Sequence, residues 1–295
     1  MVAFRVTEQS TSAKVLAGLR TSANNVDRLR EQMTTGKQVA KPSDSPTGTV
    51  SAMQLRNDIA ARERYDRSAT DGVARLSTAE AALSTGGDLL NRARDLVLQG
   101  MSQPAVGDPA ARAGIAVEIR GLRDNMISVA NTSYLGRPVF GGTTDKDRAF
   151  LDTGAYQGDT GSVQRRVGDS SQVRVDVSAD VFGTAAGNVF DVLDSIATGL
   201  ETNPATLSSD LNRLDSAKSR FTNELTAVGS RYSQLTAAQD TASTQVLALT
   251  SRLSEIEDID MAKAVIDLQT QSAGYEAALA ATARVVQPSL LDFLR

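Results

Sequence analysis

Three side chains are missing from this 295-residue chain, which contains no histidine, no cysteine and no tryptophan. Without cysteine there is neither a disulfide nor a thiolate nucleophile, and without cysteine and histidine the usual zinc ligands are absent. Histidine is also the side chain used most often as a general base near neutral pH. Since these absences leave little room for enzyme or metal chemistry, we expect no catalytic residue, no cofactor and no metal.

The charge and the hydropathy of the chain argue against two further classes of protein, those that bind nucleic acid and those that span a membrane. The formal net charge is −4, so there is no overall polycation to hold nucleic acid. No apolar run reaches about 18 residues, and we therefore expect no membrane span. Two pairs of carboxylates stand two residues apart, Asp145 with Asp147 and Asp258 with Asp260, and we interpret them as helix caps or turn formers.

The segment 205–256 has the clearest periodicity. It lies in a proline-free stretch with few glycines, as a long helix requires. One set of residues recurs every seven positions, namely Leu207, Leu214, Phe221, Val228, Leu235, Ala242, Leu249 and Ile256. A second set follows it at a spacing of four, namely Leu211, Lys218, Leu225, Tyr232, Gln239, Val246 and Leu253. This pattern predicts one long helix with coiled-coil-like packing.

Both ends of the chain carry shorter stripes of the same kind. The register breaks at Glu255–Asp260, and Asp260 is a candidate N-cap for a new helix. Its stripe is Met261, Val265, Leu268, Ser272, Tyr275, Leu279, Thr282 and Val286. The N-terminal stripe is Val15, Leu19, Ser22, Val26, Leu29 and Met33, and Gly36 is expected to end that helix. Because neither helix has another obvious partner, we expect the two to pack on each other.

The middle of the chain changes period. Ser45-Pro46 and Asp108-Pro109 are helix-start signals, and apolar stripes follow both. Between about 136 and 185, glycines are frequent, and Val173, Val175 and Val177 alternate with polar residues. This alternation predicts a strand, with residues 163–167 as its partner. We therefore expect a small β-rich insertion between helices.

Together these patterns predict a mainly α fold with a nested long-helix bundle, a terminal coiled-coil pair and a central β-rich insertion. We expect three domains. Residues 1–41 and 261–295 form the terminal coiled coil, 42–135 and 186–260 form the long-helix bundle, and 136–185 form the β-rich part.

Several short motifs, in order along the chain, resemble the bacterial flagellin family. The first is the run from Gly36 to Gly48 (GKQVAKPSDSPTG), which is similar to the signature of the family's hook–filament junction branch. Others are the turn 136–142 (GRPVFGG), the run 156–159 (YQGD), and the C-terminal motifs 258–260 and 289–294. The signature residues of the first turn are Gly36, Lys37, Val39, Pro42, Ser43, Asp44 and Pro46.

The resemblance implies a flagellin-like fold and a structural rather than enzymatic role. It implies a subunit exported through the flagellar type III system to the hook–filament junction outside the cell, where it forms a homo-oligomeric ring. The implied neighbours are hook-associated protein 1 on the hook side and flagellin on the filament side. An export chaperone on the C-terminal helix is also implied. No nucleic acid and no membrane are expected as partners.

From the stripes we predict an assembly interface made of Val15, Leu19, Val26, Leu29, Met33, Met261, Val265, Leu268, Tyr275, Leu279, Val286, Leu290, Leu291 and Phe293. Helices of this length are marginal alone, so we expect them to order fully only on assembly. Two alternatives stay open. One is a short flagellin that forms the filament itself. The other, from a different class, is a helical coiled-coil signalling or adaptor protein.

Overall fold

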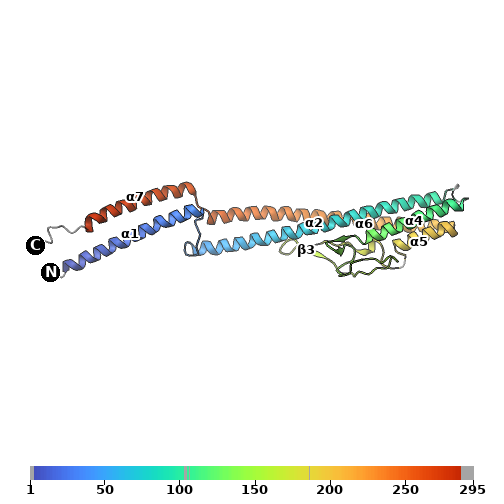
Figure 1. Cartoon of the computed structure of the whole chain (residues 1–295), viewed down its shortest axis with the longest axis horizontal. Helices are drawn as coiled ribbons and strands as arrows, with labels where there is room; N and C mark the ends of the chain where they lie inside the picture. Colours follow the sequence, from blue (N-terminus) through green and yellow to red (C-terminus); the bar gives the residue numbers. More distant parts are fainter. Residues whose placement is uncertain (1–2, 103–104, 106, 186, 287–295) are drawn as a thin grey trace. The chain divides into compact units, whose positions relative to one another are not determined.

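A computed structural model describes residues 3–102, 105, 107–185 and 187–286 of the chain. Helices dominate these residues, and strands are few and short, which confirms the mainly α prediction. Four long helices are α1 (Ala3–Thr35), α2 (Pro46–Gly100), α6 (Leu207–Glu257) and α7 (Met261–Val286). Two shorter ones are α4 (Pro109–Ala130) and α5 (Val189–Thr202) (Figure 1). None of the described helices is long and apolar enough to cross a membrane.

The contacts divide the chain into two compact units. One, which we call the terminal unit, comprises Met1–Ala60 and Val246–Arg295, and the other, the central unit, comprises Ala61–Gln245. Helices α2 and α6 contribute residues to both. The three-domain division expected from the sequence stays a prediction.

The helix boundaries follow local chemistry. Asp108 caps α4 by accepting hydrogen bonds from the backbone N–H groups of Ala110 and Ala111, at 2.9 and 3.2 Å. Asp260 caps α7 in the same way, and the Ser45 hydroxyl accepts a bond from Gly48 N–H at the start of α2. Gly36 ends α1 with φ +69°, a conformation that favours glycine. All four predicted boundaries are therefore confirmed.

The seven-residue stripe of α6 is confirmed, but its second set is partly wrong. The first six members, Leu207 to Ala242, are buried, and Leu249 and Ile256 are half-buried. Lys218 and Tyr232 of the second set are exposed. Buried Asp210 and Ala217 stand three rather than four residues after the first-set positions Leu207 and Leu214. A straight helix advances 3.6 residues per turn, so the positions three and four residues after a first-set residue both lie near the buried face. Packing against the neighbouring helices decides which of the two is buried.

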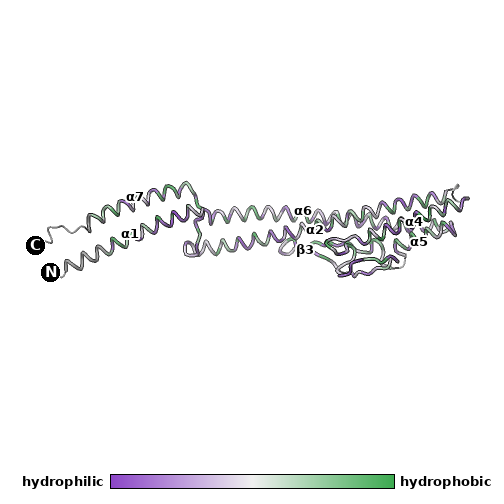
Figure 2. The backbone as a smooth tube through the Cα atoms, in the orientation of Figure 1, coloured by the Kyte–Doolittle hydropathy of each residue, from purple (hydrophilic) through white to green (hydrophobic). Residues whose placement is uncertain are grey.

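Within the central unit, α2, α4, α5 and α6 share one hydrophobic core. The buried α2 stripe runs from Leu76 to Val97 and includes Gly86, where an added Cβ would lie 2.5 Å from the Phe221 ring of α6. Glycine at this position is what allows that ring to approach the helix. Figure 2 shows hydrophobic and hydrophilic residues interspersed along the long helices, as expected for helices with one buried face.

The insertion contains two small antiparallel sheets. Strand β1 (Ser133–Tyr134) pairs with β2 (Arg137–Pro138), and β3 (Gln164–Arg166) pairs with β4 (Gln172–Arg174). The second pair confirms the predicted partnership of 163–167 with the valine-rich strand, although the regular strand ends before buried Val175 and Val177. Aromatic rings pack against one another in this part of the core. They belong to Phe140, Phe150, Tyr156, Phe182, Phe190 and, from α6, Phe221.

Candidate assembly surface and its supporting turns

Helices α1 and α7 pack on each other, as the sequence predicts, and they run antiparallel (Figure 1). Near the middle of the pair, the Gln271 side-chain amide donates a hydrogen bond to the Ser22 hydroxyl at 3.1 Å. From α1, Val26 is buried at 4% exposure, and the rest of the predicted stripe, from Val15 to Met33, is half-buried. The predicted stripe therefore lies on the less exposed side of α1, and its part in an assembly interface stays a prediction.

The α7 stripe needs a correction. The residues that are least exposed on α7 are Ala264, Leu268, Gln271, Ser272, Tyr275, Ala278 and Thr282. Met261, Val265 and Leu279, which were expected on the same packed face, are 49%, 39% and 43% exposed. The apolar surface of α7 is wider than the strip that a single partner helix covers, so these three residues lie along its edge. The side chain of Val286 and all of Leu290, Leu291 and Phe293 lie outside the described residues.

Sequence reasoning missed a further set of exposed apolar side chains in the terminal unit. They are Leu16, Val50, Met53, Leu247 and Ile266, each more than half exposed. None belongs to a predicted stripe, and an isolated exposed leucine is ordinary on protein surfaces. Together with the exposed edge of α7, they give the terminal unit several apolar side chains that nothing covers within the described residues.

The two linkers at the base of the terminal helices are joined by backbone hydrogen bonds. Lys37 and Asp258 form an isolated antiparallel bridge. The Ile259 N–H donates to the Gly36 carbonyl at 3.0 Å, and the Gln38 N–H donates to the Glu257 carbonyl at 2.6 Å. The signature turn after α1 is thus fixed directly to the break between α6 and α7.

Four charged side chains reinforce this junction, and we call them the linker clamp: Lys37, Arg56, Glu257 and Asp258. The Glu257 side chain is only 4% exposed, and it lies 2.7 Å from Arg56 and 3.4 Å from Lys37. Lys37 also contacts Asp258 at 2.6 Å. This hydrogen bond raises the pKa of Lys37 and, together with one from Ser254, holds the pKa of Asp258 below its usual value.

The signature residue Asp44 stabilises the turn itself. Its carboxylate accepts hydrogen bonds from the backbone N–H groups of Ala40 and Lys41, at 3.2 and 2.8 Å. Lys41 in turn forms a 2.6 Å ion pair with Glu31 of α1. The sequence identified the signature but not its partner, because Glu257 shows no periodic or motif signal. Its position within the register break Glu255–Asp260 is the one sequence feature that sets it apart.

A groove of about 740 Å³ lies beside the linker clamp, between α1, the signature turn and the start of α7. Its lining mixes charged and apolar side chains, among them Arg28, Leu29, Val39, Ile256 and Lys263. Among the described residues, no group of three or more acidic side chains is arranged to hold a metal ion.

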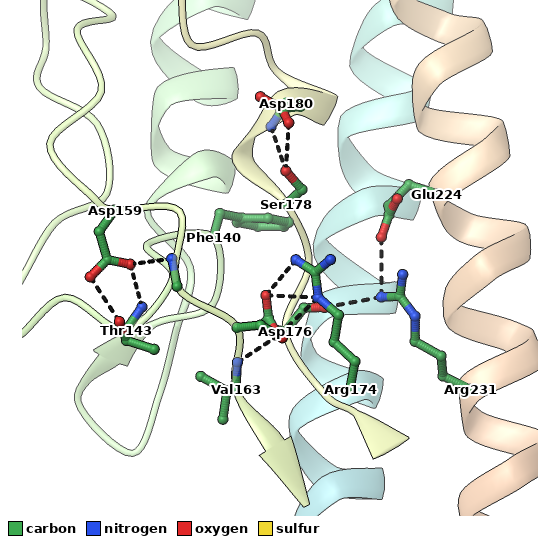
Figure 3. Close-up of polar contacts among 12 residues, drawn as sticks. Phe140, Thr143, Asp159, Val163, Arg174, Asp176, Ser178, Asp180, Glu224 and Arg231 are labelled. Carbon is green, nitrogen blue, oxygen red and sulfur yellow. Dashed lines mark hydrogen bonds and ion pairs between the residues drawn. The ribbon is translucent and has the colours of Figure 1, made fainter. Parts of the chain in front are cut away.

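Two aspartates of the central unit, Asp159 and Asp176, accept hydrogen bonds that stabilise its loops. Figure 3 shows Asp159 accepting hydrogen bonds from the Thr143 backbone N–H and hydroxyl, at 2.7 and 2.8 Å. These bonds and one from Gly161 hold the pKa of Asp159 below its usual value. Asp176 is buried and accepts from Val163 N–H and from Arg174. Each of these carboxylates is engaged in local structure, so the cluster offers no free acid or base.

Long antiparallel terminal helices, linkers joined by backbone hydrogen bonds and a small β-rich insertion define a mainly helical class of structural protein (Figure 1). Family models agree: the bacterial flagellin N-terminal helical region matches residues 6–145, and the C-terminal helical region matches residues 211–294. Together they cover most of the chain, which belongs to the bacterial flagellin family. Members of this family are structural components of the flagellum.

Three individual relatives align with this chain over most of its length and most of theirs. It is 25% identical to flagellar hook-associated protein 3 of Escherichia coli over 284 residues, which cover 87% of this chain and 89% of the relative. It is equally 25% identical to that of Salmonella typhimurium over 302 residues, covering 93% and 94%. It is also 25% identical to flagellin of Bacillus subtilis over 294 residues, covering 94% and 95%.

Solved structures confirm the fold. A putative flagellar hook-associated protein from Vibrio parahaemolyticus matches with a TM-score of 0.67 at 19% identity, covering 73% of this chain and 100% of that one. FlgL of Bacillus cereus matches with a TM-score of 0.60 at 22% identity, covering 68% and 99%.

Proposed function

We propose that this chain is the subunit of an adaptor ring that joins the flagellar hook to the filament. The observation that carries the proposal is the near-complete coverage of both this chain and two relatives named hook-associated protein 3. The signature turn 36–46 supports it, because this turn is fixed by the linker clamp and so has a definite structural role. On this proposal the neighbours are hook-associated protein 1 and flagellin.

Exposed apolar surface on the terminal unit supports assembly through α1 and α7. In the proposed ring, these helices contact other subunits. A large part of the α1–α7 surface has no cover within the described chain, so we propose that the pair orders fully only when neighbours cover it. We also propose export through the flagellar type III channel, with a chaperone on the C-terminal helix beforehand.

Antibody labelling of flagella tests the location. In a cell that produces this protein, a label at one band between hook and filament supports the proposal. Label along the whole filament would instead support the rival, a short flagellin, which has the same 25% identity to this chain in the Bacillus subtilis relative. Long filaments formed by purified subunit alone would point the same way.

Hydrogen exchange tests the ordering step. In dilute monomer, amides of α1 and α7 should exchange much faster than those of buried α2 and α6 segments, and incorporation into flagella should slow them. Strong protection of both terminal helices in the monomer would refute the ordering step without affecting the proposed location.

A further inference from the structure

Methionine is the one sulfur-containing side chain in this protein. Cysteine is absent, as are tryptophan and histidine, whereas six methionines are present. Peroxides convert the methionine thioether to a sulfoxide, which turns a flexible apolar side chain into a polar one. Because no thiol competes for the oxidant, the exposure of each methionine decides where oxidation begins.

The described methionines differ widely in exposure. Met126 is fully buried in the core of the central unit, and Met33 is half-buried in α1. Met53, Met261 and Met101 are 57%, 49% and 38% exposed. Met53 and Met261 belong to the terminal unit, and Met101 belongs to the central unit. A peroxide in solution therefore reaches both units, although the core methionine is protected.

Met261 lies on the exposed edge of α7. It is the first residue of that helix, directly after the N-cap Asp260. Val265 stands four residues later and Leu279 a further fourteen, which is close to one turn and to four turns, so the three side chains lie along one side of the helix. All three are at least 39% exposed. The Met261 thioether therefore belongs to the surface that we propose neighbouring subunits cover.

A sulfoxide at Met261 would change the chemistry of this edge. A thioether is only a weak hydrogen-bond acceptor, whereas a sulfoxide oxygen is polar and needs a donor. Water supplies that donor in the free subunit, where Met261 is exposed. Val265 and Leu279 have no side-chain donor, and a buried acceptor without a partner costs free energy. Oxidation at this position therefore disfavours the covered state and leaves the free subunit intact.

We propose that Met261 is an oxidation-sensitive site that controls the entry of the free subunit into the assembly. The thioether sulfur attacks one oxygen of hydrogen peroxide, the O–O bond breaks, and proton transfer to the leaving oxygen releases water. Sulfur is oxidised by two electrons to the sulfoxide, and the peroxide is reduced. Assembly covers Met261 and so protects it. This inference rests on the proposed function, because it concerns the regulation of the same surface.

Two full-length variants separate the site from other oxidation. The variant M33L/M53L/M101L keeps Met261, and the variant M33L/M53L/M261L keeps Met101 as the matched methionine of the central unit. Leucine is chosen because its volume is close to that of methionine. The remaining methionines are common to both variants. Each purified chain is treated with hydrogen peroxide, and peptide mass spectrometry establishes that the retained methionine is oxidised.

Binding to hook ends isolated from cells that lack this protein is the readout, measured by sedimentation. Oxidation should lower the binding of the variant that keeps Met261 at least about tenfold. The melting temperature of that variant should change by no more than about 1–2 °C. Binding of the variant that keeps Met101 should be unchanged. Methionine sulfoxide reductases A and B, which reduce the two sulfoxide epimers, should restore the lost binding.

Several results would overturn the inference. They are equal binding before and after oxidation of Met261, an equal loss in both variants, a loss that the reductases do not reverse, and a large fall in the melting temperature. The last would show that Met261 stabilises the free subunit. Failure of the untreated native chain to bind hook ends would instead refute the proposed function, so the two failures are distinguishable.

Discussion

At the residue scale, the linker clamp is the feature with the clearest physical role. Glu257 is almost fully buried, and its carboxylate is matched by two cations, Lys37 and Arg56, from different elements. A buried carboxylate without such partners would be strongly disfavoured. The same residue accepts the Gln38 amide through its backbone carbonyl. Side-chain charge and backbone bonding therefore act at one point, where α1 ends and α7 begins.

Replacing Glu257 by glutamine should loosen that point. Glu257→Gln keeps the shape but removes the charge, and since Lys37 and Arg56 are partly exposed we expect a local loss of about 1–2 kcal/mol. The amides of Gln38 and Ile259 should then exchange roughly 5–30 times faster in hydrogen-exchange measurements. Glu255→Gln, two residues earlier and exposed, is the control. Equal exchange in both variants would contradict a role for the carboxylate.

The Asp258–Lys37 pair makes the junction sensitive to acid. The hydrogen bonds from Lys37 and Ser254 hold the pKa of Asp258 below its ordinary value of 3.8, so its contribution to stability is complete above that value. It is lost as the pH falls through the lowered pKa, where the folded carboxylate takes up a proton. Thermal melts from pH 6 to about pH 2 should therefore show a steeper acid loss for the native chain than for Asp258→Asn. Parallel curves would exclude the pair as a source of acid sensitivity.

At the scale of elements, the apolar surface of α7 consists of a half-buried part and an exposed edge. Leu268 faces α1, whereas Leu279 is 43% exposed. A single stripe drawn from spacing places both on one face, but α1 covers only part of it. The exposed part, with Met261 and Val265, is the part that we propose neighbouring subunits cover.

The two leucines should respond differently to charge. Leu279→Asp should abolish assembly and leave the monomer's melting temperature within about 1–2 °C. Leu268→Asp should also weaken the α1–α7 pair, by about 1–2 kcal/mol, because its half-buried side chain would place a charge against α1. Gln269→Asp on the exposed face is the control for helix propensity. Thermal melts and sedimentation of assembled material distinguish the three.

At the scale of the whole molecule, the hydrophobic core and the proposed assembly surface occupy different parts of the chain. The core cluster runs from Ala69 to Leu235 and lies entirely within the central unit. The terminal unit contributes long helices with few buried side chains. Folding of the central unit therefore does not require the terminal helices.

Deleting residues 260–295 tests this separation. The truncated chain should keep the central unit folded, with its main thermal transition within about 2–4 °C of the full chain, because the core cluster is untouched. Assembly should be lost, since α7 and its exposed edge are gone. Circular dichroism melts and incorporation into flagella are the measurements. A truncated chain that still assembles would refute the role of α7.

Much of the fold could be predicted because it depends on neighbours in sequence. The N-caps Asp108 and Asp260 and the stop at Gly36 act within a few residues of the helix ends they define. The seven-residue repeat of α6 likewise needs no knowledge of its partner. The pairing of α1 with α7 could be predicted because each helix has an apolar face and neither has another obvious partner helix in the chain.

The sequence by itself determined the helices, their ends, the β insertion and the family resemblance, because local propensity, capping and periodicity are properties of adjacent residues. The tertiary structure alone decided that Glu257 meets Lys37 and Arg56, that Leu279 faces outward while Leu268 faces α1, and that Met261 is exposed while Met126 is buried. Each of these depends on how segments far apart in the chain approach one another.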